Sequence, residues 1–200
     1  MLRLPPVTRA LLVANILGFV MPFVVDPDFV AHLALWPFGA TAHGGAAFAP
    51  WQLVTYAFLH AGFSHLLFNM LGLWMFGSDI ERVFGTRRMW MYYIVCVVVA
   101  GLTQQVFASA TGSFYPTVGA SGGVFGLLLA FGMLFPRRTV VLLIPPIPMP
   151  AWLFVTLYGV IEIVLGVTGS QQGVAHFAHL GGMVGGYVLI KYWRSSPHRQ

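Results

Sequence analysis

The chain has 200 residues, of which 58% are hydrophobic and only 8% are charged, and its mean hydropathy is +0.81. A soluble domain of this size cannot bury so much apolar surface in one core, so the composition excludes an ordinary water-soluble protein and indicates a multi-pass membrane protein. The net charge of +5 does not indicate nucleic-acid binding, because the chain has no soluble basic face. It fits contact with anionic lipid headgroups instead.

The apolar runs, separated by polar residues or by proline and glycine, predict about six membrane-spanning helices. They cover about residues 9–25, 62–80, 89–108, 118–135, 151–167 and 173–193. With such tight loops, residues 1–200 are expected to form a single all-α domain, a six-transmembrane-helix bundle in the lipid bilayer. The first run is too long, and too poorly followed by small residues, for a removable signal peptide.

Two connecting segments have unusual compositions. Residues 26–61 are apolar for a loop and contain Trp36 and Trp51, so they are expected to lie partly in the membrane interface. Residues 145–150 contain consecutive prolines, which exclude a helix and predict a short stiff connector.

The basic residues all fall on one side of the predicted bundle. They are Arg3, Arg9, Arg82, Arg87, Arg88, Arg137, Arg138, Lys191, Arg194 and Arg199. By the positive-inside rule this side is the cytoplasm, so both termini are expected to be cytoplasmic. The compact six-span plan, without a targeting extension, fits the inner (cell) membrane of a bacterium.

A serine flanked by glycines opens the predicted span 118–135, in the segment Gly119-Ala120-Ser121-Gly122-Gly123. Glycines allow other backbones to approach closely, and the free N–H groups at the start of a helix stabilise negative charge. Under the predicted topology Ser121 lies about one turn below the outer surface. A serine in a membrane helix more often serves packing, so this segment alone does not establish a nucleophile.

His179 lies at a similar depth in the last predicted span. It shares one helix face with Gly182 and Gly186, and such small residues let a neighbouring helix approach closely. Gly122 begins a corresponding face beside Ser121. If the two faces meet, Ser121 Oγ and a ring nitrogen of His179 come within hydrogen-bonding distance.

The second predicted span carries a third polar cluster near its outer end. His65 and Asn69 are four residues apart, so both side chains project from one helix face. Two such donors, together with the backbone N–H of Ser121, suit the stabilisation of a developing oxyanion. Placing polar groups inside a bilayer costs free energy, so three polar clusters at one depth indicate that they act together in one functional site.

These patterns together resemble the motifs of rhomboid intramembrane serine proteases, over nearly the whole chain. The matching segments are Gly119-Ala120-Ser121-Gly122 for GxSG, His65-xxx-Asn69 for HxxxN, His179-xx-Gly182-xxx-Gly186 for HxxGxxxG, Glu81-Arg82-xx-Gly85 after the second span, and Trp51-Gln52 where the family usually has Trp-Arg. The GxSG pattern alone is also typical of α/β-hydrolases, but no soluble strand pattern surrounds it here.

The resemblance implies a serine endopeptidase that hydrolyses peptide bonds in or near the transmembrane segments of other membrane proteins. Ser121 is then the nucleophile, and His179 is the general base and later the general acid. His65, Asn69 and the Ser121 backbone N–H stabilise the oxyanion. No metal, organic cofactor or ATP is implied.

No carboxylate is assigned to this Ser-His dyad. Asp79 and Glu81 fall near the opposite membrane face, so we expect His179 to be oriented by packing, with the ring of Phe125 as the candidate. Some family members carry tyrosine at that position. Glu162, near the outer end of its span, is interpreted either as a functional residue or as a carboxylate that reaches the interface.

Other interpretations of the polar residues remain open. His60, His65, His176 and His179 offer ligands for zinc, but no HExxH motif occurs. Gly182 follows His179 by three positions, but the residue three positions after His176 is His179 and not a glycine. His176 is therefore interpreted as a partly hydrated residue near the outer surface. Gln104 either holds water beside the dyad or bridges helices.

Two other classes of function are compatible with a six-span chain. An inactive rhomboid-like protein that binds membrane helices is one, although such relatives usually lack the serine or the histidine. A small transporter is the other, although no inverted repeat occurs.

For the protease, we expect lateral substrate access between the second and fifth spans. The favoured substrates are segments rich in Gly, Ala, Ser or Pro, because these unwind readily.

Overall fold

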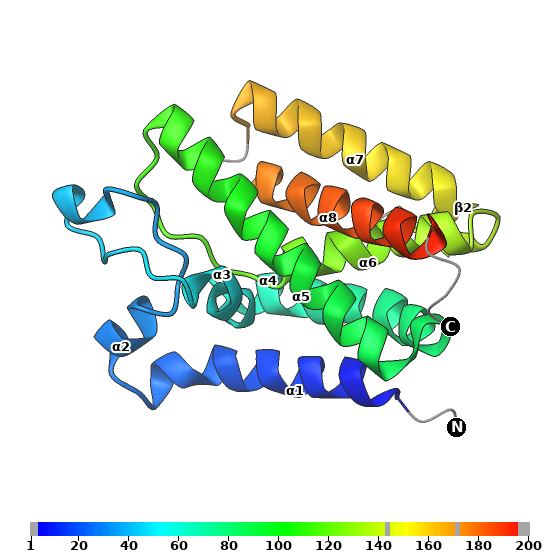
Figure 1. The fold of residues 1–200 in the computed structure, drawn as a ribbon, viewed down its shortest axis with the longest axis horizontal. Coiled ribbons are helices and arrows are strands. Elements are labelled where there is room, and N and C mark those ends of the chain that lie inside the picture. Colours follow the sequence, from blue (N-terminus) through cyan, green and yellow to red (C-terminus); the bar gives the residue numbers. More distant parts are fainter. Residues whose placement is uncertain (1–3, 143–144, 171–172, 196–200) are drawn as a thin grey trace.

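The computed structural model describes residues 4–142, 145–170 and 173–195. Its helices are α1 (Pro6–Val20), α2 (Pro27–Ala31), α3 (Gln52–Thr55), α4 (Phe63–Gly72), α5 (Ser78–Thr111), α6 (Ser121–Leu134), α7 (Ala151–Thr168) and α8 (His176–Ser195). Short 3₁₀ turns lie in the connections as η1 (Met21–Phe23), η2 (Ala40–His43) and η3 (Tyr56–Phe58), and a π-helical turn, η4 (Leu73–Gly77), joins α4 to α5. Figure 1 shows the longer helices lying side by side.

Within the described residues, three helical segments are long and apolar enough to cross a membrane: Pro6–Phe23, Phe63–Thr111 and Ala151–Thr168. The second segment is 49 residues long and bends at Gly85, whose φ of 74° is a conformation that other residues rarely adopt. The bend turns α5 back along the bundle, so this one segment corresponds to the two predicted spans 62–80 and 89–108 (Figure 1).

Two further helices do not meet these criteria, α6 by its length and α8 by its hydropathy. The apolar helix α6 has only 14 residues, and α8 contains two histidines and Lys191, which lower its mean hydropathy. Length and composition of the helices therefore establish a mostly helical membrane protein with several apolar helices, and the count of six spans stays a prediction.

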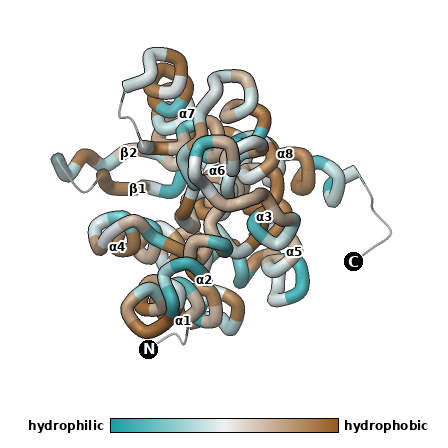
Figure 2. Tube along the Cα trace, turned by 90° about the vertical axis from the view of Figure 1, so that its left-hand side faces the viewer, coloured by the Kyte–Doolittle hydropathy of each residue, from teal (hydrophilic) through white to brown (hydrophobic). Residues whose placement is uncertain are grey.

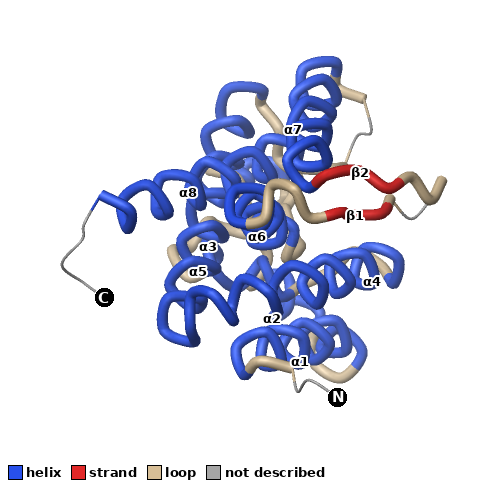
Figure 3. Tube along the Cα trace, turned by 90° about the vertical axis from the view of Figure 1, so that its right-hand side faces the viewer, coloured by secondary structure: helices blue, strands red, loops and turns tan. Residues whose placement is uncertain are grey.

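A two-stranded antiparallel hairpin is the departure from the all-α prediction. β1 (Thr139–Val141) pairs with β2 (Pro148–Pro150), and Val140 lies opposite Met149. The prolines of residues 145–150 exclude a helix, as predicted, but they are compatible with an extended edge strand. Figure 3 shows the hairpin in red between α7 and α4.

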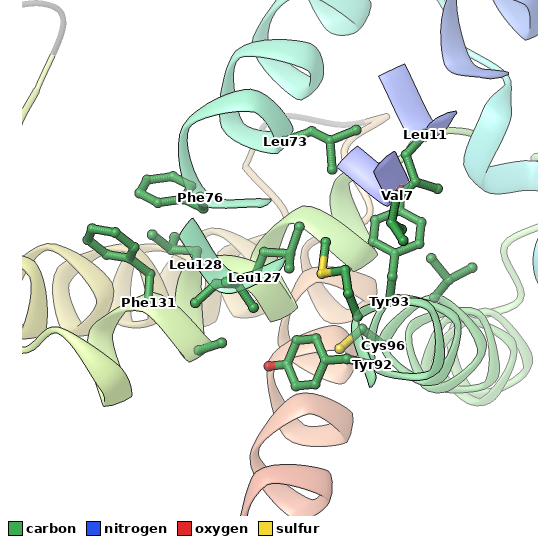
Figure 4. Packing of buried hydrophobic residues seen from close by; sticks show 14 of the residues in the cluster. Val7, Leu11, Leu73, Phe76, Tyr92, Tyr93, Cys96, Leu127, Leu128 and Phe131 are labelled. Carbon is green, nitrogen blue, oxygen red and sulfur yellow. The ribbon is translucent and has the colours of Figure 1, made fainter. Parts of the chain in front are cut away.

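The main core lies between α1, η4, α5 and α6. Figure 4 shows buried side chains from these four elements converging: Val7, Leu11, Leu73, Phe76, Tyr92, Tyr93, Cys96, Leu127, Leu128 and Phe131. The hydroxyl of Tyr92 donates a hydrogen bond of 2.7 Å to the carbonyl of Gly126, so a polar contact also joins α5 to α6. The helix α6, which begins with Ser121, is therefore fixed against α5 by apolar packing and by this hydrogen bond.

The outward faces of the bundle are also apolar. Leu17 of α1, Val167 of α7 and Val188 of α8 are 62%, 73% and 59% exposed, and Figure 2 shows apolar (brown) residues along these outer helices. Apolar patches of this extent are unfavourable in water but not in contact with lipid. The chain is therefore a multi-pass membrane protein.

The basic residues that the structure describes lie at one end of the bundle, while Arg3 and Arg199 fall outside the described residues. α1 begins and α8 ends at this same end (Figure 1). Asp79 forms ion pairs there with Arg82 at 3.1 Å and with Arg138 at 2.6 Å, so the start of α5 meets the segment after α6. This grouping agrees with the pattern expected from the sequence, while the cytoplasmic location of this end remains a prediction.

Glu81 links α5 to the start of α1. Its buried carboxylate accepts hydrogen bonds from the backbone N–H groups of Val7 (2.8 Å) and Thr8 (2.7 Å) and from the Thr8 hydroxyl (2.8 Å). The first N–H groups of a helix have no partner within the helix and form the positive end of its dipole. The carboxylate therefore caps α1 and fixes it against α5.

We expect Glu81→Ala to lower the free energy of unfolding by about 3 kcal/mol, because three buried donors lose a charged acceptor. Thermal unfolding of the purified protein in detergent measures this loss. Asp79→Ala is the matched control, since its ion pairs are exposed and are expected to contribute at most about 1 kcal/mol. Equal stability of the two variants would contradict the capping role.

Candidate active site

Ser121 is the first residue of α6, and the chain before it is held in place by backbone contacts. Gly119 has a φ of 131°, which favours glycine, and its N–H donates to the carbonyl of Tyr56 at 3.0 Å. Just before it, Thr117 and Leu35 exchange two backbone hydrogen bonds of 2.9 and 3.0 Å. Because α6 begins at Ser121, the first N–H groups of this helix, that of Ser121 included, have no partner within the helix.

The loop that supplies Leu35 is itself fixed by a buried glutamine. Gln52 accepts a hydrogen bond from Trp36 N–H at 3.1 Å and donates to the carbonyls of His32 (3.1 Å) and Ala47 (3.0 Å). Residues 26–61 are thus an ordered segment with short helices that supports the approach to Ser121.

His179 lies directly against Ser121. Its Nε2 is 2.7 Å from Ser121 Oγ, which is a hydrogen bond between α8 and α6. The helices come this close because Gly182 faces Gly122: a Cβ on Gly182 would overlap the carbonyl group of Gly122. The distance expected from the two glycine-containing faces is therefore present.

Glu162 corrects the expectation that no carboxylate approaches His179. This residue of α7 is 7% exposed, and its Oε2 is 2.9 Å from His179 Nδ1 and 2.6 Å from His176 Nδ1. It does not reach the interface, and His176 is buried, at 5% exposure, and not a hydrated surface residue. The two histidines share one carboxylate oxygen because they lie one turn apart on α8 and face α7.

Phe125 contacts His179 as expected. The two rings are stacked, with centroids 4.3 Å apart and an interplanar angle of 5°. Phe125 lies one turn after Ser121 on α6, so the same helix carries both the hydroxyl and the ring that covers the imidazole. His179 is therefore contacted on its face by an aromatic ring and on both nitrogens by oxygen atoms.

His65 and Asn69 lie on the opposite wall of the site, on α4. The ring of His65 lies against Gly119, where a Cβ would come within 2.7 Å of its Nε2. Asn69 is buried, and its Nδ2 donates a hydrogen bond of 2.9 Å to the His65 carbonyl. That bond uses one of the two amide hydrogens, so a second donor remains available to a ligand.

His60 supports this wall from outside the helix. Its ring packs edge-on against His65, with centroids 5.0 Å apart. Burial, with a smaller contribution from His65, lowers the pKa of His60 to about 4. The His60 imidazole is therefore neutral at pH 7.

A cavity of about 1240 Å³ connects these groups. It is lined by Ser121, His65, Asn69, Phe125 and His179, and it extends between α4 and α7 to Val140 of the hairpin. Gln104 also lines it, and its Oε1 is buried without a hydrogen-bond partner among the described residues. Gln105 instead donates a hydrogen bond of 2.7 Å from its Nε2 to the carbonyl of Trp36, and so holds the loop that contains Trp36.

One set of side chains could share a metal ion. Among the described residues, Glu162, His176 and His179 offer ligand atoms that all lie within 4.8 Å of one another, and His60 and His65 do not belong to this set. The separations of 2.6 and 2.9 Å are those of hydrogen bonds between imidazole N–H groups and a carboxylate. This geometry favours a network of hydrogen bonds over a zinc site that uses all four histidines.

The pairing of Glu162 with His179 was not predicted, because the motifs that contain Ser121, His179 and His65 have no acidic residue. Its signal was the antiparallel order of the last two spans: Glu162 is close to the end of one, and His176 and His179 are close to the start of the next. Consecutive antiparallel helices bring such positions to the same depth.

Most of the chain is similar in sequence to known proteins. A family model of the rhomboid domain matches residues 47–196. Rhomboid protease GluP of Bacillus subtilis is 34% identical over 139 residues, or 68% of this chain and 25% of that protein. RHOMBOID-like protein 4 of Arabidopsis thaliana is 35% identical over 157 residues, or 74% of this chain and 35% of that protein. Rhomboid protease GlpG of Yersinia pestis is 26% identical over 188 residues, or 94% and 62%.

The chain spans between 25% and 62% of the length of these relatives. The family model nevertheless covers most of the chain, and the matched range includes Ser121, His179, Glu162, His65 and Asn69. This chain belongs to the rhomboid family.

Proposed function

We propose that this protein is an intramembrane serine endopeptidase that hydrolyses peptide bonds in or near the transmembrane segments of other proteins. The observation that carries the proposal is the 2.7 Å contact between Ser121 Oγ and His179 Nε2 in a cavity among apolar helices. Two of the relatives reported above are named rhomboid proteases, which supports the same activity.

The chemistry follows from the atoms present. Ser121 Oγ attacks the carbonyl carbon of the scissile bond while its proton passes to His179 Nε2. The oxyanion that forms is stabilised by the Ser121 backbone N–H, His65 and Asn69. His179 then gives its proton to the leaving amine, and a water molecule activated by the same nitrogen hydrolyses the acyl-enzyme ester.

The membrane arrangement that supports this activity has six spans with the basic end in the cytoplasm, both termini on that side, and Ser121 near the outer face. The inner membrane of a bacterium is the proposed location. Substrate helices reach the cavity laterally, between α4 and α7, because the cavity lies between these two helices. A segment that contains Gly, Ala, Ser or Pro unwinds most easily and exposes the carbonyl that Ser121 attacks.

Cleavage of a single-span model substrate by the purified protein, in liposomes without added metal or nucleotide, tests the function. We expect two products with a cut near the outer end of the span, and covalent labelling of Ser121 by a fluorophosphonate, located by mass spectrometry. Absence of both cleavage and labelling would refute the protease and favour a rhomboid-like protein that only binds membrane helices.

Asn69→Ala should lower kcat/KM for the model substrate about 100-fold, because one donor to the oxyanion is lost. The rate of cleavage at several substrate concentrations measures the effect. Ser64→Ala is the control on the same helix, since Ser64 is exposed and lies outside the cavity. If both variants cleave like the unchanged protein, Asn69 takes no part in stabilising the oxyanion.

A further inference from the structure

The polar network around His179 extends beyond the serine and the histidine. Three hydrogen bonds connect Ser121 Oγ to His179 Nε2 (2.7 Å), His179 Nδ1 to Glu162 Oε2 (2.9 Å), and Glu162 Oε2 to His176 Nδ1 (2.6 Å). The groups come from α6, α7 and α8, and Glu162, His176 and His179 are buried. Buried charged groups are rarely left without such partners, and this carboxylate faces two imidazoles at once.

We infer that Glu162 positions His179 for catalysis and completes a Ser121–His179–Glu162 triad, with His176 holding the carboxylate in place. The inference rests on the proposed function and deepens it. The geometry is that of a serine protease triad, in which a carboxylate on Nδ1 and the nucleophile on Nε2 occupy the two ends of one imidazole.

The first contribution of Glu162 is to select the tautomer. A carboxylate only accepts hydrogen bonds, so His179 donates to it from Nδ1–H. Nε2 is then left with a free lone pair that takes the proton of Ser121. The stack of Phe125 on the imidazole fixes the plane of the ring, but a ring face does not distinguish one nitrogen from the other.

The second contribution is charge. When Nε2 takes the serine proton, His179 becomes an imidazolium, and the negative charge of the buried Glu162 stabilises it. The Nδ1 proton stays on His179 throughout, while Nε2 takes the proton from Ser121 and gives it to the leaving amine. The carboxylate is unchanged at the end of the cycle.

His176 has a supporting role on the same helix, one turn before His179. Its Nδ1–H donates to the same oxygen, Glu162 Oε2, and fixes the rotamer of the carboxylate. Its Nε2 is buried and has no hydrogen-bond partner among the described residues. His176 therefore acts on Glu162 and does not contact Ser121 directly.

Glu162→Gln tests the inference, because glutamine keeps the size of the side chain but removes the charge. An amide also can donate a hydrogen bond to Nδ1 and so favour the wrong tautomer. We expect kcat to fall between about 10²- and 10⁴-fold, with KM unchanged within about twofold, because the binding surface is intact. His176→Phe keeps a buried ring and should lower kcat about tenfold, through the loss of one hydrogen bond to a charged group.

Two further measurements separate positioning from folding. Thermal unfolding of Glu162→Gln should match that of Thr156→Val, a control on the lipid-facing side of α7 that is expected to keep full activity. NMR of protein with ¹⁵N-labelled histidine reports which ring nitrogen carries the proton, and the Nδ1–H of His179 should be lost or shifted in Glu162→Gln.

The outcomes distinguish this inference from the proposed function. Serine-dependent cleavage with full kcat in Glu162→Gln would overturn the triad and leave the protease intact. Loss of stability in parallel with kcat, with unchanged histidine spectra, would make Glu162 a structural residue only. Activity that is removed by a chelator and restored by Zn²⁺ would replace the triad by a metal site. No serine-dependent cleavage in the unchanged protein would overturn both proposals.

Discussion

Ser121→Ala is expected to reduce cleavage of the model substrate by at least about 10⁴-fold, to a rate set by binding and the oxyanion donors alone. The hydroxyl oxygen is the atom that becomes bonded to the substrate carbonyl carbon, and no other described side chain is hydrogen-bonded to His179 Nε2. Alanine fits the same backbone, because Ser121 is a helical residue in an ordinary conformation.

The matched control for this variant is Ser113→Ala, which removes a hydroxyl from the cavity wall without touching His179. We expect Ser113→Ala to cleave at the rate of the unchanged protein and both variants to unfold at the same temperature. A fluorophosphonate should label Ser113→Ala but not Ser121→Ala. Continued cleavage or labelling in Ser121→Ala would identify another nucleophile and contradict the mechanism.

The positions of the helices were largely predictable from the sequence, since they depend on the lengths of the apolar runs and on the residues that interrupt these runs. The bend at Gly85 and the helix start at Ser121 both lie where glycines occur in the sequence, and the bounds Ala151–Thr168 nearly match the predicted span 151–167. The hairpin at Thr139–Val141 was not predictable in the same way. Three residues are too few for a strand pattern, and their pairing depends on a turn whose partners are set by tertiary contact.

Local spacing predicted part of the site and failed where contacts cross between helices. His179 and Gly182 were placed correctly because one helix face fixes both, but Gly186 packs against Tyr92 of α5 and not against α6. α8 lies against two helices at once, and a face of glycines does not specify which neighbour each residue meets. Glu162 was recognised as a possible functional residue, but its contacts with His176 and His179 were not predicted, since these partners belong to another helix.

Gly182→Val is expected to abolish cleavage and to lower the free energy of unfolding by about 3 kcal/mol, because a Cβ at this position would overlap the backbone of Gly122. Backbone atoms cannot rotate away as a side chain can, so α8 must move from α6. The 2.7 Å contact between Ser121 and His179 depends on that approach. A displacement of about 1 Å is enough to cost 100-fold in rate before any loss of folded protein.

Gly159→Ala is the control for a glycine in a neighbouring helix, since its Cβ would meet only the end of Met183 at an ordinary distance of 3.7 Å. It should keep full activity and an unchanged unfolding temperature. Gly182→Ala separates the two effects of Gly182→Val: if this smaller substitution leaves the protein folded but lowers kcat and fluorophosphonate labelling together, the glycine contact sets the distance between the nucleophile and its base. Normal activity in Gly182→Val would mean that α6 and α8 need not approach this closely for catalysis.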